Sequence, residues 1–512
     1  MSSSSLSHAA RRWAIFGALA LLRVFRKLIS RSDETYKLLF TPGFERFRWR
    51  VGRWRAWLAL ERARQEVPAY REFLAAHGNP RVRLNGFDPD FAAVPPTDKE
   101  SYVRRYSIEE RCRGGRIPPA GVVIDESSGT SGAANNWVRG REERKEVKQA
   151  LQVAFHDLLG REAIFFLNAF ALGPWATGMN VSMSLVDVAI LKSVGPDIGK
   201  IEATLRTFGP KYKYVIAGYP PFLKTLVDSA DVDWSAYDLL ALFGGEGMSE
   251  GMRSYLLGKG FKAAYGSYGA SDLEINIGVE SDFTIALRRL LAADEELAAR
   301  LLRREHGVLP MVFQYNPIDY CVETNEAGEL IVTLNRTANA SPKIRYNIHD
   351  LGHVVRMPEV ARILREHGVA LSSLERPRTD LPLLFLYGRA DAAVAYYGSK
   401  VTPADVEQAI FALPELAARV NSFALVVSED ERANKLLTIA LELCEGQRPA
   451  RDGSEELRRK VIERLEAGNQ DFREAARFMP PEALPRLEFH LYGDGPFARN
   501  DIRLKKHYVQ TR

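Results

Sequence analysis

The sequence predicts an α/β protein with a large N-terminal part, built from βαβ units, and a small α+β domain at the C-terminus. Three observations carry this prediction. From about residue 120, short apolar stretches alternate with amphipathic helical stretches, as in stacked βαβ units with a parallel sheet. Residues 320–324 and 329–334 are β-rich, and the turn-forming sequence between them predicts an antiparallel hairpin. After Gly388 a new pattern of helices and strands begins.

The expected elements follow from this pattern. Strands are predicted at 163–168, 186–193, 214–217, 239–243 and 261–265 in the large part. In the small domain, helices are predicted at 403–413 and 453–467, and strands at 422–427 and 436–444. Before residue 120 the chain looks helical, and Thr97 is the expected N-cap of one helix, with Glu100 as its capping-box partner. We therefore divide the chain into a helical region, 1–119, a core, 120–387, and a small α+β domain, 388–512.

Composition excludes several classes of protein. The 512 residues are 46% hydrophobic and 26% charged, which is typical of a globular protein. The net charge of +5 is a mild excess that predicts no nucleic-acid partner. Cys112, Cys321 and Cys444 lie far apart in the sequence, so we expect neither a disulfide scaffold nor a Cys-rich zinc site. A reducing, cytoplasmic location fits this cysteine content.

The N-terminal segment 11–31 has an apolar run at 13–22 with basic residues on both sides and no acid before Asp33. The run is about half of the ~20 residues that a transmembrane helix needs. Two interpretations stay open. The segment is either a terminal helix packed on its own domain, which base rates favour, or a basic amphipathic helix that contacts an anionic membrane at the inner face.

A strand at 121–124 leads into the sequence DESSGTSG at 125–132. Glycines allow the backbone to approach a ligand closely, and successive N–H groups and hydroxyls can bind phosphate oxygens. Four further motifs follow in order: FGGEGMSE at 243–250, YGSYGASDLE at 265–274, IRYNIHDLG at 344–352, and LYGRADAAVAYYGSKVTPADVE at 386–407. Each motif alone is weakly specific, but the ordered set is strong.

This ordered set resembles the adenylate-forming superfamily of acyl-CoA synthetases, peptide-synthetase adenylation domains and luciferases. Its phenylacetate–CoA ligase-like branch is the most similar. The resemblance covers residues 90–412 in recognisable motifs, and it implies a large adenylate-forming domain followed by a small mobile domain. It also implies that ATP is the nucleotide, Mg²⁺ the metal and coenzyme A the co-substrate.

Residue roles come with the resemblance. The resemblance implies that the phosphates of ATP are held by Ser127, Ser128, Gly129, Thr130, Ser131 and Gly132. The family often has a lysine after this loop, where this chain has Ala133 to Asn136, so Arg139 or Arg141 would have to supply the charge. The implied adenine and α-phosphate contacts are Gly244, Gly245, Glu246, Tyr268, Gly269 and Ser271.

The remaining roles concern ribose, metal, hinge and catalysis. Asp350 matches the acid that accepts both ribose hydroxyls, as an acceptor-only carboxylate can. Arg389 matches an arginine that reaches ribose or phosphate, and Asp391 matches the hinge residue. Asp272 matches the Mg²⁺ ligand, with Glu274 as a nearby substitute. Lys505, or else Lys506, would be the catalytic lysine of the tail, and a solvated basic tail is the alternative.

The acyl pocket is expected between the sheet and Gly244–Gly245, with Phe170, Trp175, Tyr219 and Gly245 in its wall and Phe222 as a further aromatic candidate. The implied function is ATP-dependent activation of a small carboxylic acid, followed by transfer to coenzyme A. Two alternatives stay open. In the first, the enzyme loads an acyl or peptidyl carrier protein or forms an amide. In the second, the chain is a degenerate relative that binds nucleotide without turnover.

Overall fold

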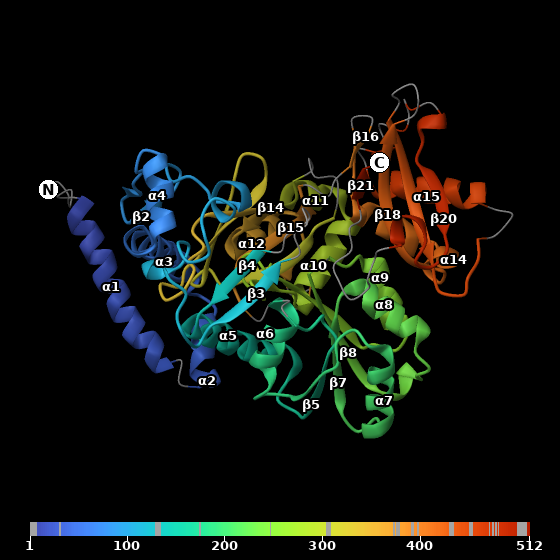
Figure 1. Ribbon diagram of the computed structural model, residues 1–512, viewed down its shortest axis with the longest axis horizontal. Coiled ribbons are helices and arrows are strands. Elements are labelled where there is room, and N and C mark those ends of the chain that lie inside the picture. Colours follow the sequence, from blue (N-terminus) through green and yellow to red (C-terminus); the bar gives the residue numbers. More distant parts are fainter. Residues whose placement is uncertain are drawn as a thin grey trace.

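The computed structural model describes residues 8–29, 32–127, 135–173, 176–245, 247–303, 309–371, 374, 379–390, 394–396, 399–429, 435–449, 454–469, 472–473, 476, 479, 481–498 and 509–511. Within them, one mixed sheet of eleven strands forms the centre of the large part, in the order β12-β13-β14-β15-β11-β10-β9-β8-β7-β5-β6. Helices surround this sheet, and the C-terminal domain lies at one end of the molecule (Figure 1). This arrangement confirms the predicted α/β class.

The parallel half of the sheet consists of β5 (Ile164–Asn168), β6 (Ile190–Ser193), β7 (Lys213–Gly218), β8 (Asp238–Gly244) and β9 (Ala263–Tyr268). Every neighbouring pair among them is parallel, as predicted. In β7, Tyr214 and Ile216 pack on one face and Val215 and Ala217 on the other, and all four are buried. A parallel strand covered by helices on both faces explains this continuous apolar run.

Two groups of helices cover these faces. On one face lie α5 (Arg141–Leu159) and α6 (Ala176–Leu185). On the other lie α7 (Ile198–Phe208), α8 (Pro220–Ser229) and α9 (Glu250–Gly258). The predicted strand at 186–193 is too long, because Val186, Val188 and Ala189 donate backbone hydrogen bonds back to residues 182 and 185 and so extend the end of α6.

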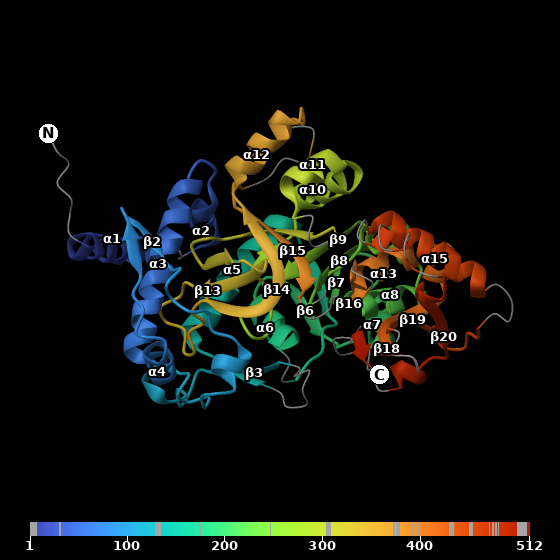
Figure 2. The same cartoon turned by 90° about the horizontal axis from the view of Figure 1, so that it is seen from above.

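The antiparallel half contains β10 (Gly278–Val279), β11 (Met311–Tyr315), β12 (Tyr320–Thr324), β13 (Glu329–Leu334), β14 (Tyr346–Val355) and β15 (Leu383–Arg389). The β12–β13 hairpin has the predicted antiparallel register, with Thr324 opposite Leu330. One face packs on α10 (Asp282–Ala293), α11 (Glu295–Leu301) and α12 (Met357–Glu366). Figure 2 shows these three helices together on one side of the sheet.

The N-terminal region is helical, as predicted, and wraps the antiparallel half. It comprises α1 (His8–Ile29), α2 (Asp33–Tyr36), η1 (Lys37–Phe40), α3 (Glu45–Glu66), α4 (Pro68–Ala76), and the short hairpin of β1 (Arg83–Asn85) and β2 (Asp88–Asp90). The turn η2 (Lys99–Val103) is capped by Asp98 with Ser101, so the expected Thr97 cap is wrong. Thr97 instead donates from Oγ1 to the Ile344 carbonyl at 3.0 Å and bridges to Tyr346.

The C-terminal domain has its own core of residues from 394 onward, around α13 (Pro403–Phe411) and α15 (Ser454–Gly468). Its sheet has the order β20-β19-β18-β21, formed by β18 (Val420–Glu429), β19 (Lys435–Leu443), β20 (Arg486–His490) and β21 (Val509–Thr511). The remaining elements are α14 (Pro414–Ala417), β16 (Val394–Tyr396) and β17 (Ser399–Val401). This domain contacts the large part where Phe411 lies against Tyr255, with ring centroids 6.1 Å apart, and where Thr225 bonds Asn421 at 3.0 Å.

Candidate nucleotide and acyl site

Three of the predicted nucleotide-binding residues come together at the end of β9. Tyr268 is the last residue of that strand, and Asp350 lies in β14. The Tyr268 hydroxyl donates to Asp350 Oδ2 at 2.7 Å. Arg389 ends β15 and stands opposite Asp350 in the β14–β15 register. Residues from three separate motifs thus form one polar cluster.

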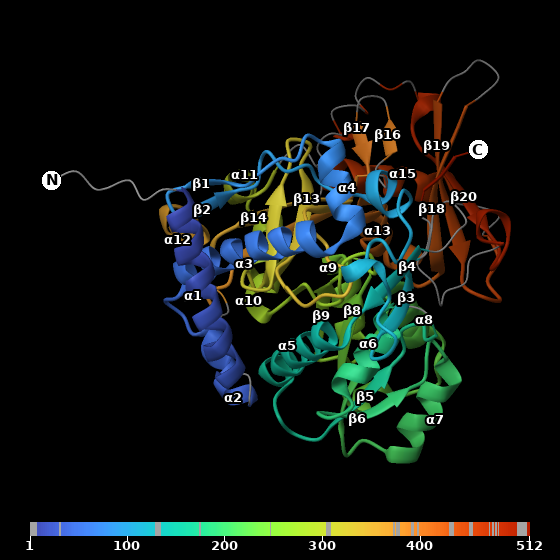
Figure 3. The same cartoon turned by 60° about the vertical axis from the view of Figure 1, so that its left-hand side comes forward.

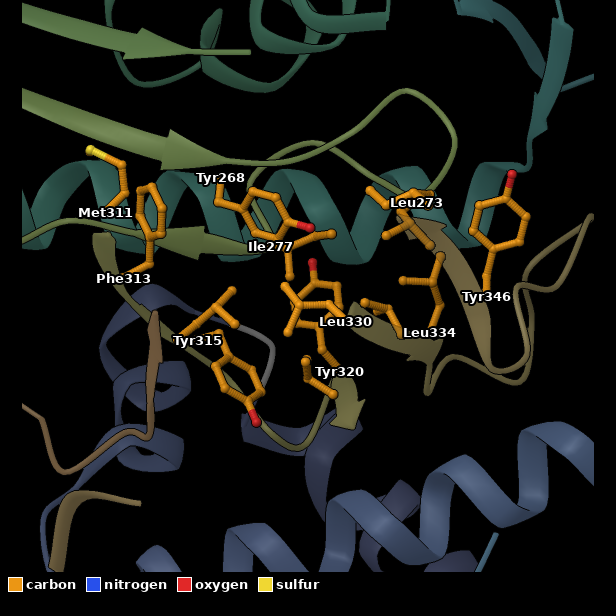
Figure 4. Close-up of a cluster of buried hydrophobic side chains, with 14 of the residues drawn as sticks. Tyr268, Leu273, Ile277, Met311, Phe313, Tyr315, Tyr320, Leu330, Leu334 and Tyr346 are labelled. Atoms are coloured by element: carbon orange, nitrogen blue, oxygen red, sulfur yellow. The ribbon is translucent and has the colours of Figure 1, made fainter. Parts of the chain in front are cut away.

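Electrostatics fix the state of this cluster. Burial raises the pKa of Tyr268 well above its ordinary value, and Asp350 raises it further, against an opposing effect of Arg389. The tyrosine is therefore a hydrogen-bond donor throughout the physiological range. Its ring lies beside Phe313, with centroids 5.9 Å apart, within the apolar cluster drawn in Figure 4.

The backbone next to Asp350 has an unusual conformation. His349 has a φ of +64°, in the left-handed region that glycine adopts most readily. Three contacts hold it there: its Nδ1 lies 2.8 Å from Glu329 Oε1, its N–H donates to Asn347 Oδ1 at 2.8 Å, and its carbonyl accepts from Ala390 N at 2.8 Å. The last contact joins the ends of β14 and β15, and so positions Asp350 beside Arg389.

Asp272, the predicted metal ligand, is 6% exposed and pairs with Lys99 at 3.1 Å. Its Oδ2 also accepts from the Tyr346 hydroxyl at 3.2 Å. The alternative ligand Glu274 is paired with Arg336 and accepts from the Tyr320 hydroxyl at 2.6 Å. Among the described residues, no cluster of three or more acidic, histidine or cysteine side chains is placed to hold a metal.

Arg139 has a different place from the one suggested by the sequence. It pairs with Asp125 at 3.1 Å and donates to the carbonyls of Ser271 and Leu273. Arg139 therefore holds the turn after Tyr268, with its hydrogen-bonding groups directed at protein atoms rather than at a loop-bound phosphate. The sequence could not indicate this, because the turn lies more than 130 residues away.

A cavity of about 420 Å³ begins beside this cluster. Gly244, Gly245 and Gly269 line it at the strand ends, together with Phe170. Tyr219 lies behind this wall, its ring 5.3 Å from that of Phe170 and in close contact with Gly245. Phe222 is 0% exposed and belongs to the core.

Gly245 has a φ of +79°, and a Cβ there would lie 2.7 Å from the Tyr219 ring, so only glycine fits without rearrangement. The other predicted residues lie outside the described part of the chain. These are Ser128, Gly129, Thr130, Ser131, Gly132, Trp175, Glu246, Asp391, Lys505 and Lys506. Ser127 is described by its backbone, which pairs with Asn135 at the end of the β3 (Val123–Ser127) and β4 (Asn135–Arg139) hairpin.

The whole chain was compared with known protein families, curated proteins and solved structures. No protein-family model and no curated protein matches it. A solved structure of a 2-hydroxyisobutyryl-CoA ligase in the postadenylation state, in complex with R3-HIB-AMP, matches with a TM-score of 0.68 and 14% identity over 94% of this chain and 93% of that chain. The same ligase with 2-HIB-AMP and CoA in the thioesterification state matches with a TM-score of 0.52 and 16% identity over 92% and 91%. The chain therefore has the fold of this CoA ligase.

Proposed function

We propose that this chain activates a carboxylic acid with ATP and transfers the acyl group to a thiol, with coenzyme A as the proposed acceptor. In the first step a carboxylate oxygen attacks the α-phosphorus, the bond to the bridging oxygen breaks, and pyrophosphate leaves. In the second step the thiol sulfur attacks the acyl carbon, AMP leaves, and the thiol proton is released. The observation that carries this proposal is the Tyr268–Asp350–Arg389 cluster, whose chain neighbours Ser267 and Gly269 line an apolar cavity.

The described residues have roles in binding and orientation. Asp350 would accept the ribose hydroxyls, and Arg389 would bind the same sugar or a phosphate with its fixed fork of donors. Gly244 and Gly245 would let the adenylate lie against backbone, with the acyl group directed into the cavity. Positioning and charge neutralisation of this kind supply most of the catalysis in a phosphoryl-centred displacement.

For Mg²⁺, Asp272 is the proposed ligand. Mg²⁺ is commonly held by one or two carboxylates together with substrate phosphates, so a single acid can suffice. The Lys99 ammonium 3.1 Å from Asp272 stands where a cation would bind, which supports the fit. When bound, the metal would neutralise charge on the phosphates.

The other assignments remain proposals as well. The loop 127–132 would bind phosphate, Asp391 would be the hinge of a mobile domain 388–512, and Lys505 or Lys506 would stabilise charge during adenylation. A carrier protein or an amine as acceptor, and a degenerate nucleotide binder, are the alternatives.

Exchange of pyrophosphate into ATP across a panel of carboxylic acids tests the proposal. We expect acid-dependent exchange and AMP release, and addition of coenzyme A separates the acceptors. Release of ADP and phosphate would contradict the proposal, and nucleotide binding without exchange would favour the degenerate binder.

We further propose that α1 contacts an anionic membrane surface. Its inner face packs on the protein, with Ile15 and Leu19 buried and Phe16 against Trp57. This is the packing expected of a terminal helix that lies on its own domain. Its outer face is apolar: Trp13, Leu21, Val24 and Phe25 are 56–77% exposed. Figures 1 and 3 show α1 along one edge of the molecule.

Charge favours a lipid surface as the occupant of this outer face. Helix α1 contains no acidic residue, and Arg11 and Arg23 lie at the borders of its apolar face. Arg12 and Arg26 face inward, where they pair with Glu61 at 3.3 Å and Asp319 at 2.9 Å. In the described part of the chain, no helix combines the length and hydropathy that membrane crossing requires.

A further inference from the structure

The cavity next to the nucleotide cluster extends beyond the strand ends as far as the segment after α2. Its lining begins at Gly244 and Gly245 and continues between α5 and the sheet to Lys37, Thr41 and Pro42, around η1. We propose that the acid activated by this chain is a long-chain aliphatic one, whose tail lies along this cavity. This inference rests on the proposed function and specifies its substrate class.

The walls of the cavity match an aliphatic tail. Phe155 and Leu159 of α5, Phe166 of β5, and Val181 and Leu185 of α6 line it. An apolar lumen gains affinity with every methylene it removes from water, by roughly three- to fourfold for each one.

Polar side chains in the lining are engaged by the protein. The Tyr265 hydroxyl donates to Asp282 at 2.7 Å, and the Ser267 hydroxyl donates to Asn276 at 3.0 Å. Glu280 pairs with Arg253 at 2.9 Å. A hydrocarbon chain cannot form hydrogen bonds with these polar side chains, but their protein partners already do. An apolar ligand therefore leaves the hydrogen bonds of the cavity wall intact.

The volume of the cavity sets the length of the chain. At roughly 30 Å³ per water-sized group, a volume of 420 Å³ corresponds to about fourteen methylene-sized groups, counting the part of the cavity at Gly244 and Gly245. An acid with a single aromatic ring would fill about half of this space. Close packing of the ligand therefore favours a long chain.

The far end of the cavity lies at the surface. There Lys37 of η1 and Asp157 of α5 are 3.9 Å apart, and their side chains are 33% and 46% exposed. The short segments α2 and η1 follow α1 directly in the chain, so this end of the cavity adjoins the helix with the exposed apolar face (Figure 3).

The experiment uses the full chain and the variant Ala154→Phe. Ala154 lies on α5 and lines the cavity from a different element than the glycines at the strand ends. A phenyl ring there shortens the lumen without touching the nucleotide cluster. The matched control is Ala75→Phe, because Ala75 is exposed on α4, outside the cavity lining.

Pyrophosphate exchange is measured with butanoate, hexanoate, decanoate, hexadecanoate and phenylacetate. We expect decanoate and hexadecanoate to be the best substrates of the parent. The ratio of the hexadecanoate to the hexanoate rate should fall at least tenfold in Ala154→Phe and stay unchanged in Ala75→Phe. Exchange with only butanoate or phenylacetate, or an equal effect of Ala154→Phe at every chain length, overturns the inference and leaves the proposed function standing.

Equilibrium dialysis with labelled hexadecanoate separates the two proposals if no acid supports exchange. Binding that Ala154→Phe weakens would then retain the long-chain cavity while the proposed function fails. Absence of both exchange and binding overturns both.

Discussion

The Tyr268 hydroxyl donates a 2.7 Å hydrogen bond to Asp350 Oδ2, and both side chains are at least 93% buried. One residue ends a parallel strand and the other lies in an antiparallel strand of the same sheet. The bond therefore joins the two halves of the sheet at the point where the apolar cavity begins. It also holds the Asp350 carboxylate in place before any nucleotide binds.

Asp350→Ala should weaken ATP binding by about 1.5–3 kcal/mol, because hydrogen bonds to a charged acceptor are lost. Titration calorimetry on the folded variant measures this change. Tyr268→Phe should have a smaller effect, since the carboxylate remains. Asp231→Ala is the matched control, because the Asp231 side chain is 99% exposed and remote from the cluster. Unchanged ATP affinity of Asp350→Ala would exclude its ribose role.

Lys99→Met should lower the Mg²⁺ concentration that half-saturates ATP binding by severalfold, because it frees Asp272 from its 3.1 Å ion pair. Asp272→Asn should raise that concentration, since an amide is a weaker ligand for a hard cation. Calorimetric Mg²⁺ titrations in the presence of ATP measure both. Glu359→Gln serves as control, on the exposed side of α12. If neither variant changes the Mg²⁺ requirement, the Lys99–Asp272 pair is purely structural.

The combined variant Trp13→Ser, Leu21→Ser and Phe25→Ser should reduce binding to phosphatidylserine vesicles at least tenfold. Three apolar side chains lose their contact with lipid, each worth up to ~1.5–3 kcal/mol when fully buried. Binding by the parent should weaken with salt, because Arg11 and Arg23 contribute ~1 kcal/mol each near an anionic surface. Point variants are preferable to deleting residues 1–31, which would also expose Trp57 and remove one of the two arginine partners of Asp319.

Val186→Ser with Ile190→Ser is the control for these vesicles, since both side chains are exposed apolar residues outside α1. Equal vesicle binding by the parent and the α1 variant would contradict the membrane proposal. A dimer in sedimentation that the α1 variant abolishes would assign the outer face to a second copy of the chain.

Lys343→Met should stabilise the protein near pH 7, and the gain should shrink as the pH rises toward 10. Lys343 is 4% exposed, with its ammonium 4.4 Å from the centre of the Trp137 ring. Burial, together with the nearby charges of Arg139 and Arg111, lowers its pKa from 10.5 to about 7. Between pH 7 and pH 10.5 the Lys343 ammonium keeps its proton in the unfolded chain and loses it in the folded protein. The free energy of unfolding that Lys343 takes away therefore becomes smaller as the pH rises.

Urea unfolding midpoints of the parent and Lys343→Met at pH 7, 8.5 and 10 measure this difference. Lys460→Met is the control, because Lys460 is partly exposed on α15. A difference between parent and variant that does not depend on pH would mean that Lys343 remains protonated in the folded protein. Glu143 titrates nearby, with a pKa raised to about 7 by burial, so the change between pH 8.5 and pH 10 decides the comparison.

The sequence singles out Tyr268, Asp350 and Arg389, because each of them lies in a motif whose order along the chain is informative. The contacts between these residues could not be predicted. A motif does not say that Tyr268 bonds Asp350, or that Lys99 pairs with Asp272, since these pairs are set by how distant segments pack.

The local sequence pattern also gave wrong predictions where backbone or hydroxyl groups form hydrogen bonds with other partners. The apolar residues from Val186 look like a strand, yet their N–H groups bond back to the end of α6. Thr97 looks like a helix cap, but its hydroxyl bonds the Ile344 carbonyl across the fold. The length of the cavity is likewise a property of packing between α5 and the sheet, which no single stretch of sequence contains.

The basic C-terminal tail contains Lys505, the proposed catalytic lysine. A lysine that stabilises charge developing only in the transition state should matter for adenylation and little for ground-state ATP binding. Lys505→Ala should therefore lower the adenylation rate by roughly 10²–10³-fold, the scale seen when one preorganised charge donor is removed. Stopped-flow or quenched single-turnover assays with ATP and the preferred acid measure this rate, and calorimetry measures ATP affinity.

Thiol transfer from a preformed acyl-adenylate should be nearly unchanged in Lys505→Ala, because a residue that acts only on the first step has no charge to stabilise in the second. Lys460→Ala, which removes a lysine from the partly exposed surface of α15, is the matched control. If Lys506→Ala shows the loss and Lys505→Ala does not, the catalytic lysine is Lys506. If neither slows adenylation, the tail is a solvated basic end, and Arg389 beside Asp350 is the described cation that remains to stabilise the transition state.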